Sequence, residues 1–110
     1  MSNCVFCKII NNEIKAEKVY EDEDIVAVKD INPQAPYHIL IITKKHIPTI
    51  LDLEDEKIMV SIFNGIKQVS KILNLNSFRV VNNCGPDAFQ TIYHLHIHIL
   101  GGRKFSWPPG

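Results

Sequence analysis

The chain has 110 residues, 45% of them apolar and 22% charged, which fits one domain with a small core of its own over residues 1–110. The 12 basic residues balance the 12 acidic ones, and no run of Lys and Arg occurs, so we expect neither nucleic acid nor an anionic membrane as a partner. The apolar stretches are too short to span a bilayer, and the first residues do not read as a signal peptide. With only three cysteines, we expect a cytoplasmic protein without disulfides, with the nucleus as an additional location.

The first half of the chain predicts a short helix followed by three strands. Residues 5–12 predict the helix, and alternation of side chains predicts strands over 19–21 and 25–29 around an acidic turn. Two prolines predict a loop over 32–36, because proline fixes φ and cannot donate to a strand ladder. The almost continuously apolar segment 38–46 predicts the third strand.

Residues 53–74 predict a long helix, because apolar residues recur there at the i, i+3, i+4 and i+7 spacing. Acidic residues gather at its start, and Lys67 and Lys71 stand near its end, which suits the helix dipole. We predict Asp52 as the N-cap. The apolar face should pack into the core, and its width also allows a subunit contact.

The second half predicts a strand over 77–83, a loop over 84–90 and a further strand that contains a row of histidines. Strands interspersed with helices and joined by short links indicate an α+β domain with a mainly antiparallel sheet.

Three histidines, His94, His96 and His98, alternate with apolar residues in the last of these strands. Residues two apart share one face of a strand, so we expect these imidazoles side by side. The other face should pack into the core; it carries Tyr93, Leu95, Ile97 and Ile99. Burial of three imidazoles without partners is costly, so the histidine face predicts a lined site, a solvent cleft or a metal centre.

Three kinds of chemistry suit such a row. Paired imidazoles can chelate zinc, one histidine can act as a nucleophile, or the row can simply bind an anion. The preceding segment, "NNCGPDAFQT", carries amides, a glycine and a hydroxyl that suit phosphate oxygens, and its only carboxylate is Asp87. This composition favours phosphate chemistry at a histidine nucleophile.

The motif "HLHIHIL" at 94–100 matches the pattern His-φ-His-φ-His-φ-φ, where φ is apolar. The chain resembles the histidine-triad (HIT) family, and specifically its Hint branch of nucleoside phosphoramidases, through this motif, "DINPQAPYHILIITKKHI" and the tail "WPPG". The resemblance implies a mainly antiparallel five-stranded sheet with one long and one short helix, extended across a homodimer. The Fhit-like dinucleoside polyphosphate hydrolases usually continue past this point, so the short tail favours the Hint branch.

The resemblance also implies catalytic roles. His96 would attack the α-phosphorus of a nucleotide and form a covalent nucleotidyl-histidine. His98 would hydrogen-bond a phosphate oxygen or the departing group, and His38 would complete the polar cluster. Because an amine leaving group is readily protonated, catalysis would need no cofactor.

The nucleotide-binding residues follow from the same resemblance. Asp30 would accept hydrogen bonds from the ribose hydroxyls, and Trp107 would approach the active site of the partner subunit. The phosphate would be bound by Asn83, Gln90 and Thr91. The purine would lie in an apolar slot formed by Val5, Phe6, Ile9, Ile31 and Leu40.

Phe89 departs from the family pattern, which commonly has glycine immediately before the glutamine of the phosphate loop. A phenylalanine adopts a positive φ less readily than glycine does. The departure bears on the loop geometry and on the choice of leaving group, not on the nucleophile.

Cys4 and Cys7 form a Cys-x-x-Cys pair, a spacing found in zinc sites and in redox pairs. Together with His46 and His94, which the catalytic roles leave unused, they make a Cys₂His₂ set suited to a structural zinc ion. A thioredoxin-like redox pair and two buried structural cysteines are the alternatives. Cys84, in the phosphate loop, is expected to be an inert residue, with an oxidation-sensitive thiol as the alternative.

These expectations describe a purine nucleoside phosphoramidase that binds AMP and adenosine phosphoramidates and cleaves the P–N bond of AMP–amine or AMP–lysine conjugates. Three alternatives stay open: a dinucleoside polyphosphate hydrolase of the same family, a hydrolase with a catalytic zinc on the histidine strand, and a purine-nucleotide-binding interaction module without activity.

Overall fold

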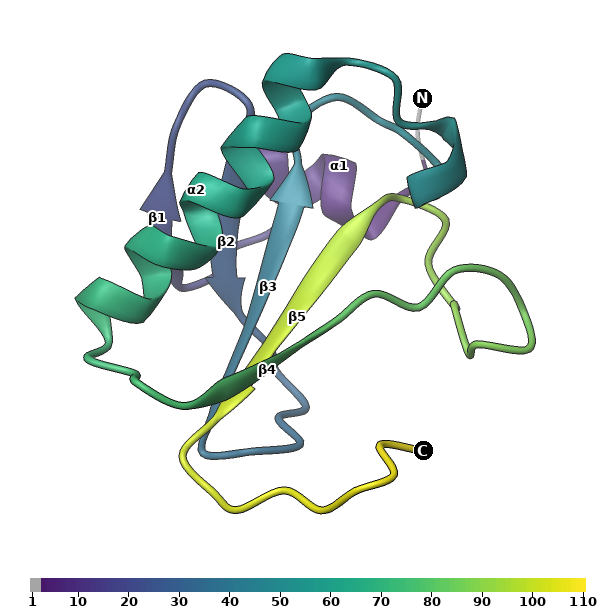
Figure 1. Cartoon of the computed structure of the whole chain (residues 1–110). Helices are drawn as coiled ribbons and strands as arrows, with labels where there is room; N and C mark the ends of the chain where they lie inside the picture. Colours follow the sequence, from purple (N-terminus) through teal and green to yellow (C-terminus); the bar gives the residue numbers. More distant parts are fainter. Residues whose placement is uncertain (1–2) are drawn as a thin grey trace.

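The computed structural model describes residues 3–110. It contains a five-stranded sheet of order β1-β2-β3-β5-β4, in which all neighbouring strands are antiparallel (Figure 1). The strands are β1 (Lys18–Glu21), β2 (Ile25–Lys29), β3 (Tyr37–Thr43), β4 (Phe78–Val81) and β5 (His96–Gly101). The helices are α1 (Val5–Ile10) and α2 (Glu56–Ile72), with a 3-10 turn at Ile50–Asp52. The predicted α+β fold, with one long and one short helix, is confirmed. Within the described residues, no helix is both long and apolar enough to cross a membrane.

The two helices cover opposite faces of the sheet (Figure 1). Under α2, the helix residues Ile58, Ile62, Ile66 and Val69 pack on strand residues that include Ile25, Ile39, Ile41, Ile97 and Ile99. Under α1, a second cluster joins Phe6, Ile9, Val26, Val28, Leu40 and Ile42. Burying each such side chain contributes about 1.5–3 kcal/mol, so β2 and β3, buried on both faces, anchor the fold.

Helix α2 begins three residues later than predicted, and its N-cap is Asp55, whose side chain accepts from the N–H of Lys57 at 2.9 Å. Asp52, the predicted cap, instead closes the 3-10 turn, where its carboxylate accepts from the N–H of Thr49 at 3.1 Å. The prediction was wrong because the acidic segment holds two capping sequences in succession, and each carboxylate caps the turn next to it.

The histidine strand is also shorter than predicted, because β5 begins at His96 and the segment before it has no strand geometry. The N–H of Leu95 donates to the carbonyl of Ile47 at 2.6 Å, and the His94 ring is turned into the interior with 0% exposure. The alternation therefore holds only from His96 onward, with His96 and His98 on one face and Ile97 and Ile99 in the core.

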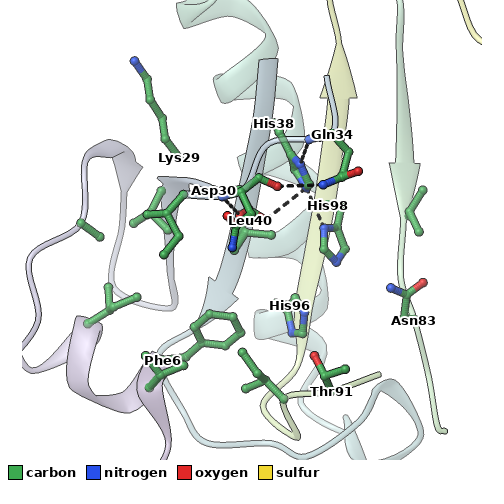
Figure 2. A pocket seen from close by; sticks show the side chains of 18 of the residues that line it. Phe6, Lys29, Asp30, Gln34, His38, Leu40, Asn83, Thr91, His96 and His98 are labelled. Carbon is green, nitrogen blue, oxygen red and sulfur yellow. Dashed lines mark hydrogen bonds and ion pairs between the residues drawn. The ribbon is translucent and has the colours of Figure 1, made fainter. Parts of the chain in front are cut away.

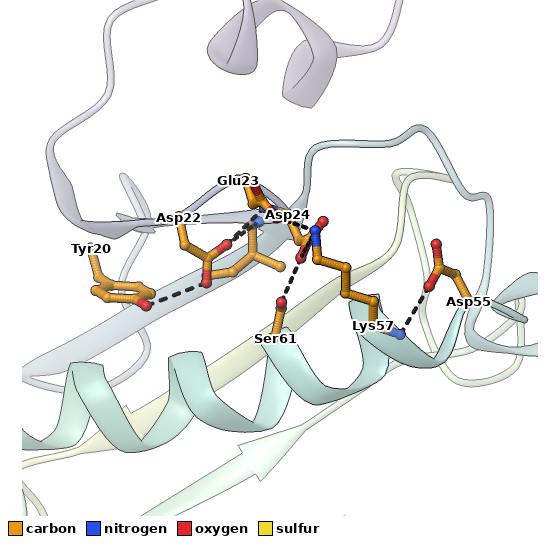
Figure 3. Close-up of polar contacts among 8 residues, drawn as sticks. Tyr20, Asp22, Glu23, Asp24, Asp55, Lys57 and Ser61 are labelled. Atoms are coloured by element: carbon orange, nitrogen blue, oxygen red, sulfur yellow. Dashed lines mark hydrogen bonds and ion pairs between the residues drawn. The ribbon is translucent and has the colours of Figure 1, made fainter.

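An acidic turn joins β1 to β2 and contacts the start of α2 (Figure 3). One oxygen of Asp22 accepts from the N–H groups of Asp24 and Ile25, which fixes the predicted turn. The hydroxyl of Ser61 donates to Asp24 at 2.7 Å, and Lys57 pairs with Glu23. These contacts hold α2 against the hairpin and leave the opposite face of the sheet to the pocket described next.

Candidate active site

A pocket of about 800 Å³ opens on the face of the sheet that carries α1 (Figure 2). One wall is apolar and comes from α1, β2 and β3; it includes Val5, Phe6, Ile9, Val28 and Leu40. The opposite wall comes from β4 and the following loop, with Asn83, Phe89 and Thr91. His96 and His98 lie between the two walls, so every residue predicted for the purine slot lines the pocket, including Ile31 at its exposed rim.

The hydrogen bond of His96 fixes which of its ring nitrogens carries the proton. Nδ1 lies 2.7 Å from the carbonyl oxygen of His94, which can only accept, so the proton is on Nδ1 and Nε2 keeps its lone pair in the pocket. The Phe6 ring packs edge-on at 4.8 Å between centroids. Burial lowers the pKa of His96, while the His94 carbonyl and Asp30 oppose this, so the imidazole is neutral near neutral pH.

His98 and His38 form a second pair, and a backbone hydrogen bond determines which ring nitrogen of each carries the proton. The N–H of Gln34 donates to His38 Nδ1 at 3.0 Å, so the His38 proton is on Nε2, which donates to His98 Nδ1 at 2.9 Å. The proton of His98 is therefore on Nε2, and His98 presents an N–H donor to the pocket. Burial, with smaller contributions from His96 and His38, lowers the pKa of His98 to about 4.

Asp30 lies beside this pair in the pocket. One carboxylate oxygen accepts from the N–H of Asn32 at 2.8 Å, and the other is 3.4 Å from His38 Nε2. The carboxylate is fixed in direction at the rim, next to the purine slot, where a ribose hydroxyl can donate to it.

The phosphate loop is only partly as predicted. Asn83 and Thr91 line the pocket, but the structure does not bring the Gln90 side chain into it. The Gln90 amide is buried, accepts from the N–H of Gly85 at 2.9 Å, and donates to the carbonyls of Pro48 and Ile92 at 2.9 and 3.1 Å. Both N–H groups of the amide are engaged, so in this structure the Gln90 side chain supports the loop from behind, and its contact with phosphate stays a prediction.

Phe89 adopts a left-handed backbone with φ of 67°, the conformation that the family's usual glycine favours. The loop therefore has a positive φ at this position although a phenylalanine occupies it.

Trp107 does not line the pocket of its own chain. The Arg79 guanidinium lies 5.8 Å from the Trp107 ring centroid and 5.0 Å from that of Phe105, and it also donates to the carbonyl of Ser106. These contacts hold the exposed tryptophan on the β4 side of the molecule. Its approach to a partner's site stays a prediction.

Cys4, Cys7, His46 and His94 form a compact cluster, with all their candidate ligand atoms within 4.8 Å of one another. Sγ of Cys4 lies 3.1 Å from His94 Nδ1, and Sγ of Cys7 lies 3.2 Å from His46 Nδ1. Because His94 Nε2 donates to the carbonyl of Thr43 at 2.6 Å, its Nδ1 carries a lone pair towards the thiols. Two thiols and two imidazoles fit a tetrahedral zinc ion, which would tie the N-terminal helix to the segment before β5.

Asp30, His38 and His98 form a second compact group of possible metal ligands. Here the hydrogen bonds argue against a metal, because His38 Nδ1 already accepts from the N–H of Gln34. Coordination through Nε2 would then require a His38 imidazolate, with no proton on either nitrogen. Since His94 also faces away from His96 and His98, a catalytic zinc on the histidine strand is disfavoured.

Two backbone groups that set histidine tautomers could not be identified from the sequence. The Gln34 N–H sets the tautomer of His38, and the Thr43 carbonyl sets that of His94. Any residue except proline supplies an N–H, and every residue supplies a carbonyl, so only the fold reveals them.

The chain matches the family model described as "HIT domain" over residues 11–105. Among curated proteins it is 48% identical over 109 residues to a HIT-like protein of Synechocystis, covering 96% of each chain. It is 45% identical over 115 residues to the "14 kDa zinc-binding protein" of Zea mays, covering 99% of this chain and 89% of the maize protein.

Solved structures give the same result. A HIT family hydrolase of Legionella pneumophila superposes with a TM-score of 0.93 at 46% identity, covering 98% of this chain and 100% of the other. A histidine triad nucleotide-binding protein of Candida albicans superposes with a TM-score of 0.86 at 30% identity, covering 96% and 83%.

Proposed function

This chain belongs to the HIT family, and from that premise we propose that it is a purine nucleoside phosphoramidase of the Hint branch, which cleaves the P–N bond of AMP–amine conjugates. The observation that carries the proposal is the tautomer of His96, whose Nδ1–H is held by a main-chain carbonyl while Nε2 is available in the pocket. The relatives named as a hydrolase and as a nucleotide-binding protein support the class of activity and of ligand.

The pocket can hold the nucleotide in one orientation. The purine would lie against Phe6, Ile9 and Leu40, and the ribose hydroxyls would donate to Asp30. The α-phosphate would then lie at His96, with Asn83 and Thr91 on its far side.

In the first step, His96 Nε2 attacks phosphorus and the P–N bond breaks. The amine leaves with the bonding electron pair and takes up one proton, while His98 Nε2–H donates a hydrogen bond to the departing nitrogen or to a phosphoryl oxygen. In the second step, water attacks phosphorus, the bond to His96 breaks, and water releases one proton. The sum consumes one water and yields AMP and the amine, such as lysine.

Hydrolysis of adenosine 5′-phosphoramidate tests the proposal. We expect His96→Ala to abolish turnover with an unchanged thermal unfolding midpoint, and an AMP adduct trapped on the wild type to map to His96 by mass spectrometry. Undiminished turnover in that variant, or an adduct on another residue, would refute the nucleophile.

A second candidate is a purine-nucleotide-binding interaction module without activity, and Phe89, which departs from the family pattern in the phosphate loop, is the observation that favours it. Tight binding of AMP with no turnover of phosphoramidates, acyl adenylates or dinucleoside polyphosphates would select it. Turnover of dinucleoside polyphosphates alone would select the other hydrolase branch.

We further propose a homodimer and a structural zinc ion. The exposed Val60 and Phe63 on α2 and, separately, the open edge of β4 support the dimer, which analytical ultracentrifugation tests. The Cys₂His₂ cluster supports zinc, as does the name of the maize relative. The Cys₂His₂ cluster can hold zinc only with reduced thiols, and this supports a reducing location such as the cytoplasm.

A further inference from the structure

Phe89 is in a backbone conformation that its side chain disfavours. Three non-glycine residues of the described chain have a positive φ: Asn12, Asn74 and Phe89. Asparagine tolerates this region because its short polar side chain bonds locally, whereas a bulky residue does not. A strained residue next to a pocket is a reason to ask what its side chain does there.

The loop fixes this conformation without help from the phenyl ring. The N–H of Phe89 donates to the carbonyl of Pro86, and the N–H of Gln90 donates to that of Gly85, both at 3.0 Å. The Gln90 side chain braces the same turn from behind. The ring itself is exposed, as Phe89 keeps 79% of its surface accessible, so it adds little to the core. Stability does not explain a phenylalanine at this position.

Phe89 lines the pocket, and the nucleotide would place only its phosphate group near the side that carries Asn83 and Thr91. Phe6 and Leu40 lie on one side of His96, and Asn83 and Thr91 lie on the other (Figure 2). Phe89 belongs to this second wall, with Thr91. A nucleotide whose purine packs on Phe6 and whose phosphorus lies at His96 would direct its leaving group away from the purine slot, towards Phe89.

We propose that Phe89 selects the leaving group: it contacts the amine part of the substrate and favours phosphoramidates of aromatic or extended apolar amines over those of small amines. The inference rests on the proposed phosphoramidase function and leaves its bond changes unaltered. An aromatic contact of this kind corresponds to a rate difference of about tenfold.

The test compares Phe89→Gly with the wild type on two substrates, adenosine 5′-phosphoramidate and its N-phenethyl derivative. Glycine accepts the positive φ, so the loop should keep its shape. We expect kcat/KM for the phenethyl compound to fall about tenfold, with a change below about twofold for the small substrate and for the Kd of AMP. Phe89→Leu should lose part of the preference. The control Leu51→Ala removes a side chain of similar exposure, 83%, outside the pocket. It should change kcat/KM for neither substrate.

The outcomes separate the two proposals. An equal loss on both substrates, a weaker Kd for AMP, or a gain with the phenethyl compound would overturn leaving-group selection, since Phe89 would then act on the loop, on the nucleotide or as a steric barrier. If the wild type hydrolyses neither compound, the phosphoramidase function fails. Affinities of the two intact compounds for His96→Ala, with and without Phe89→Gly, then still decide whether Phe89 contacts the amine.

Discussion

The carbonyl oxygen of His94 accepts a hydrogen bond from Nδ1 of His96 at 2.7 Å, so the residue whose ring faces the cysteines also orients the residue that faces the pocket. The His94 ring is held in turn by the Thr43 carbonyl and lies 3.1 Å from the Cys4 sulfur. The Cys₂His₂ cluster and the proposed nucleophile therefore share one stretch of backbone, and a change at one should be measurable at the other.

Loss of the cluster should destabilise the protein and loosen His96. We expect Cys4→Ser and Cys7→Ser to lose bound zinc and about 2–4 kcal/mol of unfolding free energy, because a metal that binds only the folded state stabilises it. Elemental analysis and urea unfolding measure this, and the NMR signal of the His96 Nδ1–H reports the bond to His94. Cys84→Ser, outside the cluster, is the matched control. An unfolding midpoint that does not respond to zinc or to chelator in the wild type would contradict the prediction.

Activity should persist below the ordinary pKa of histidine. Protonation of His96 at Nε2 removes the attacking lone pair, and burial lowers the pKa at which this occurs. We expect kcat/KM to be level near neutral pH and to fall on the acid side with a midpoint below 6.5. Asp30 raises the pKa values of His96 and His98, so Asp30→Asn should move the midpoint further to acid, while Asp87→Asn should not. A wild-type midpoint above 6.5 would show that burial does not control the nucleophile.

The free energy of unfolding should also fall as the pH drops below 6.5. The unfolded chain takes up a proton at His98 near 6.5, whereas the folded chain resists until about 4. The folded pKa is the lower one, so stability is complete above 6.5 and is lost as the pH falls towards 4, by up to about 1.4 kcal/mol per pH unit from this group. Urea unfolding of metal-free protein at several pH values measures the slope, and His98→Gln should reduce it. Equal slopes in the variant and the wild type would exclude His98 as the source.

The sequence predicted the pocket wall better than the exact roles within it. Phe6, Leu40 and Asp30 line the pocket, as the resemblance to the HIT family implied. The supporting contacts of the Gln90 side chain could not be predicted, since an amide can bind phosphate or brace a loop and only the fold places Pro48 beside it. The grouping of His94 with Cys4 was predicted from the count of possible zinc ligands, whereas the rotation of its ring out of the strand alternation depends on a contact between segments 90 residues apart.

The pair formed by His38 and His98 should contribute more to kcat when the leaving group needs a proton to depart. The His38 Nε2–H keeps the His98 proton on Nε2, where it meets the substrate. We expect His38→Asn to lower kcat for adenosine 5′-phosphoramidate by about 10²-fold and to affect an acyl adenylate far less, because a carboxylate leaves without a proton. Rapid-quench kinetics on both substrates measure the two rates. The same loss on both would indicate that His38 acts on phosphate binding instead.

Gly102 is the position at which we expect a single methyl group to affect the site from outside the pocket. It follows β5 with φ of +88°, and an added Cβ would lie 2.9 Å from atoms of both Pro36 and Tyr37, next to the loop that supports His38. Gly102→Ala combines a left-handed backbone with this overlap, so we expect a loss of about 2–4 kcal/mol in unfolding free energy, measured by urea denaturation. Gly85→Ala is the matched control, because its φ is +90° but nothing lies within 4 Å of the added carbon. It should cost only about 1–2 kcal/mol. Equal losses in the two variants would show that backbone conformation alone requires glycine here, and that the close approach of the loop before β3 is not the constraint.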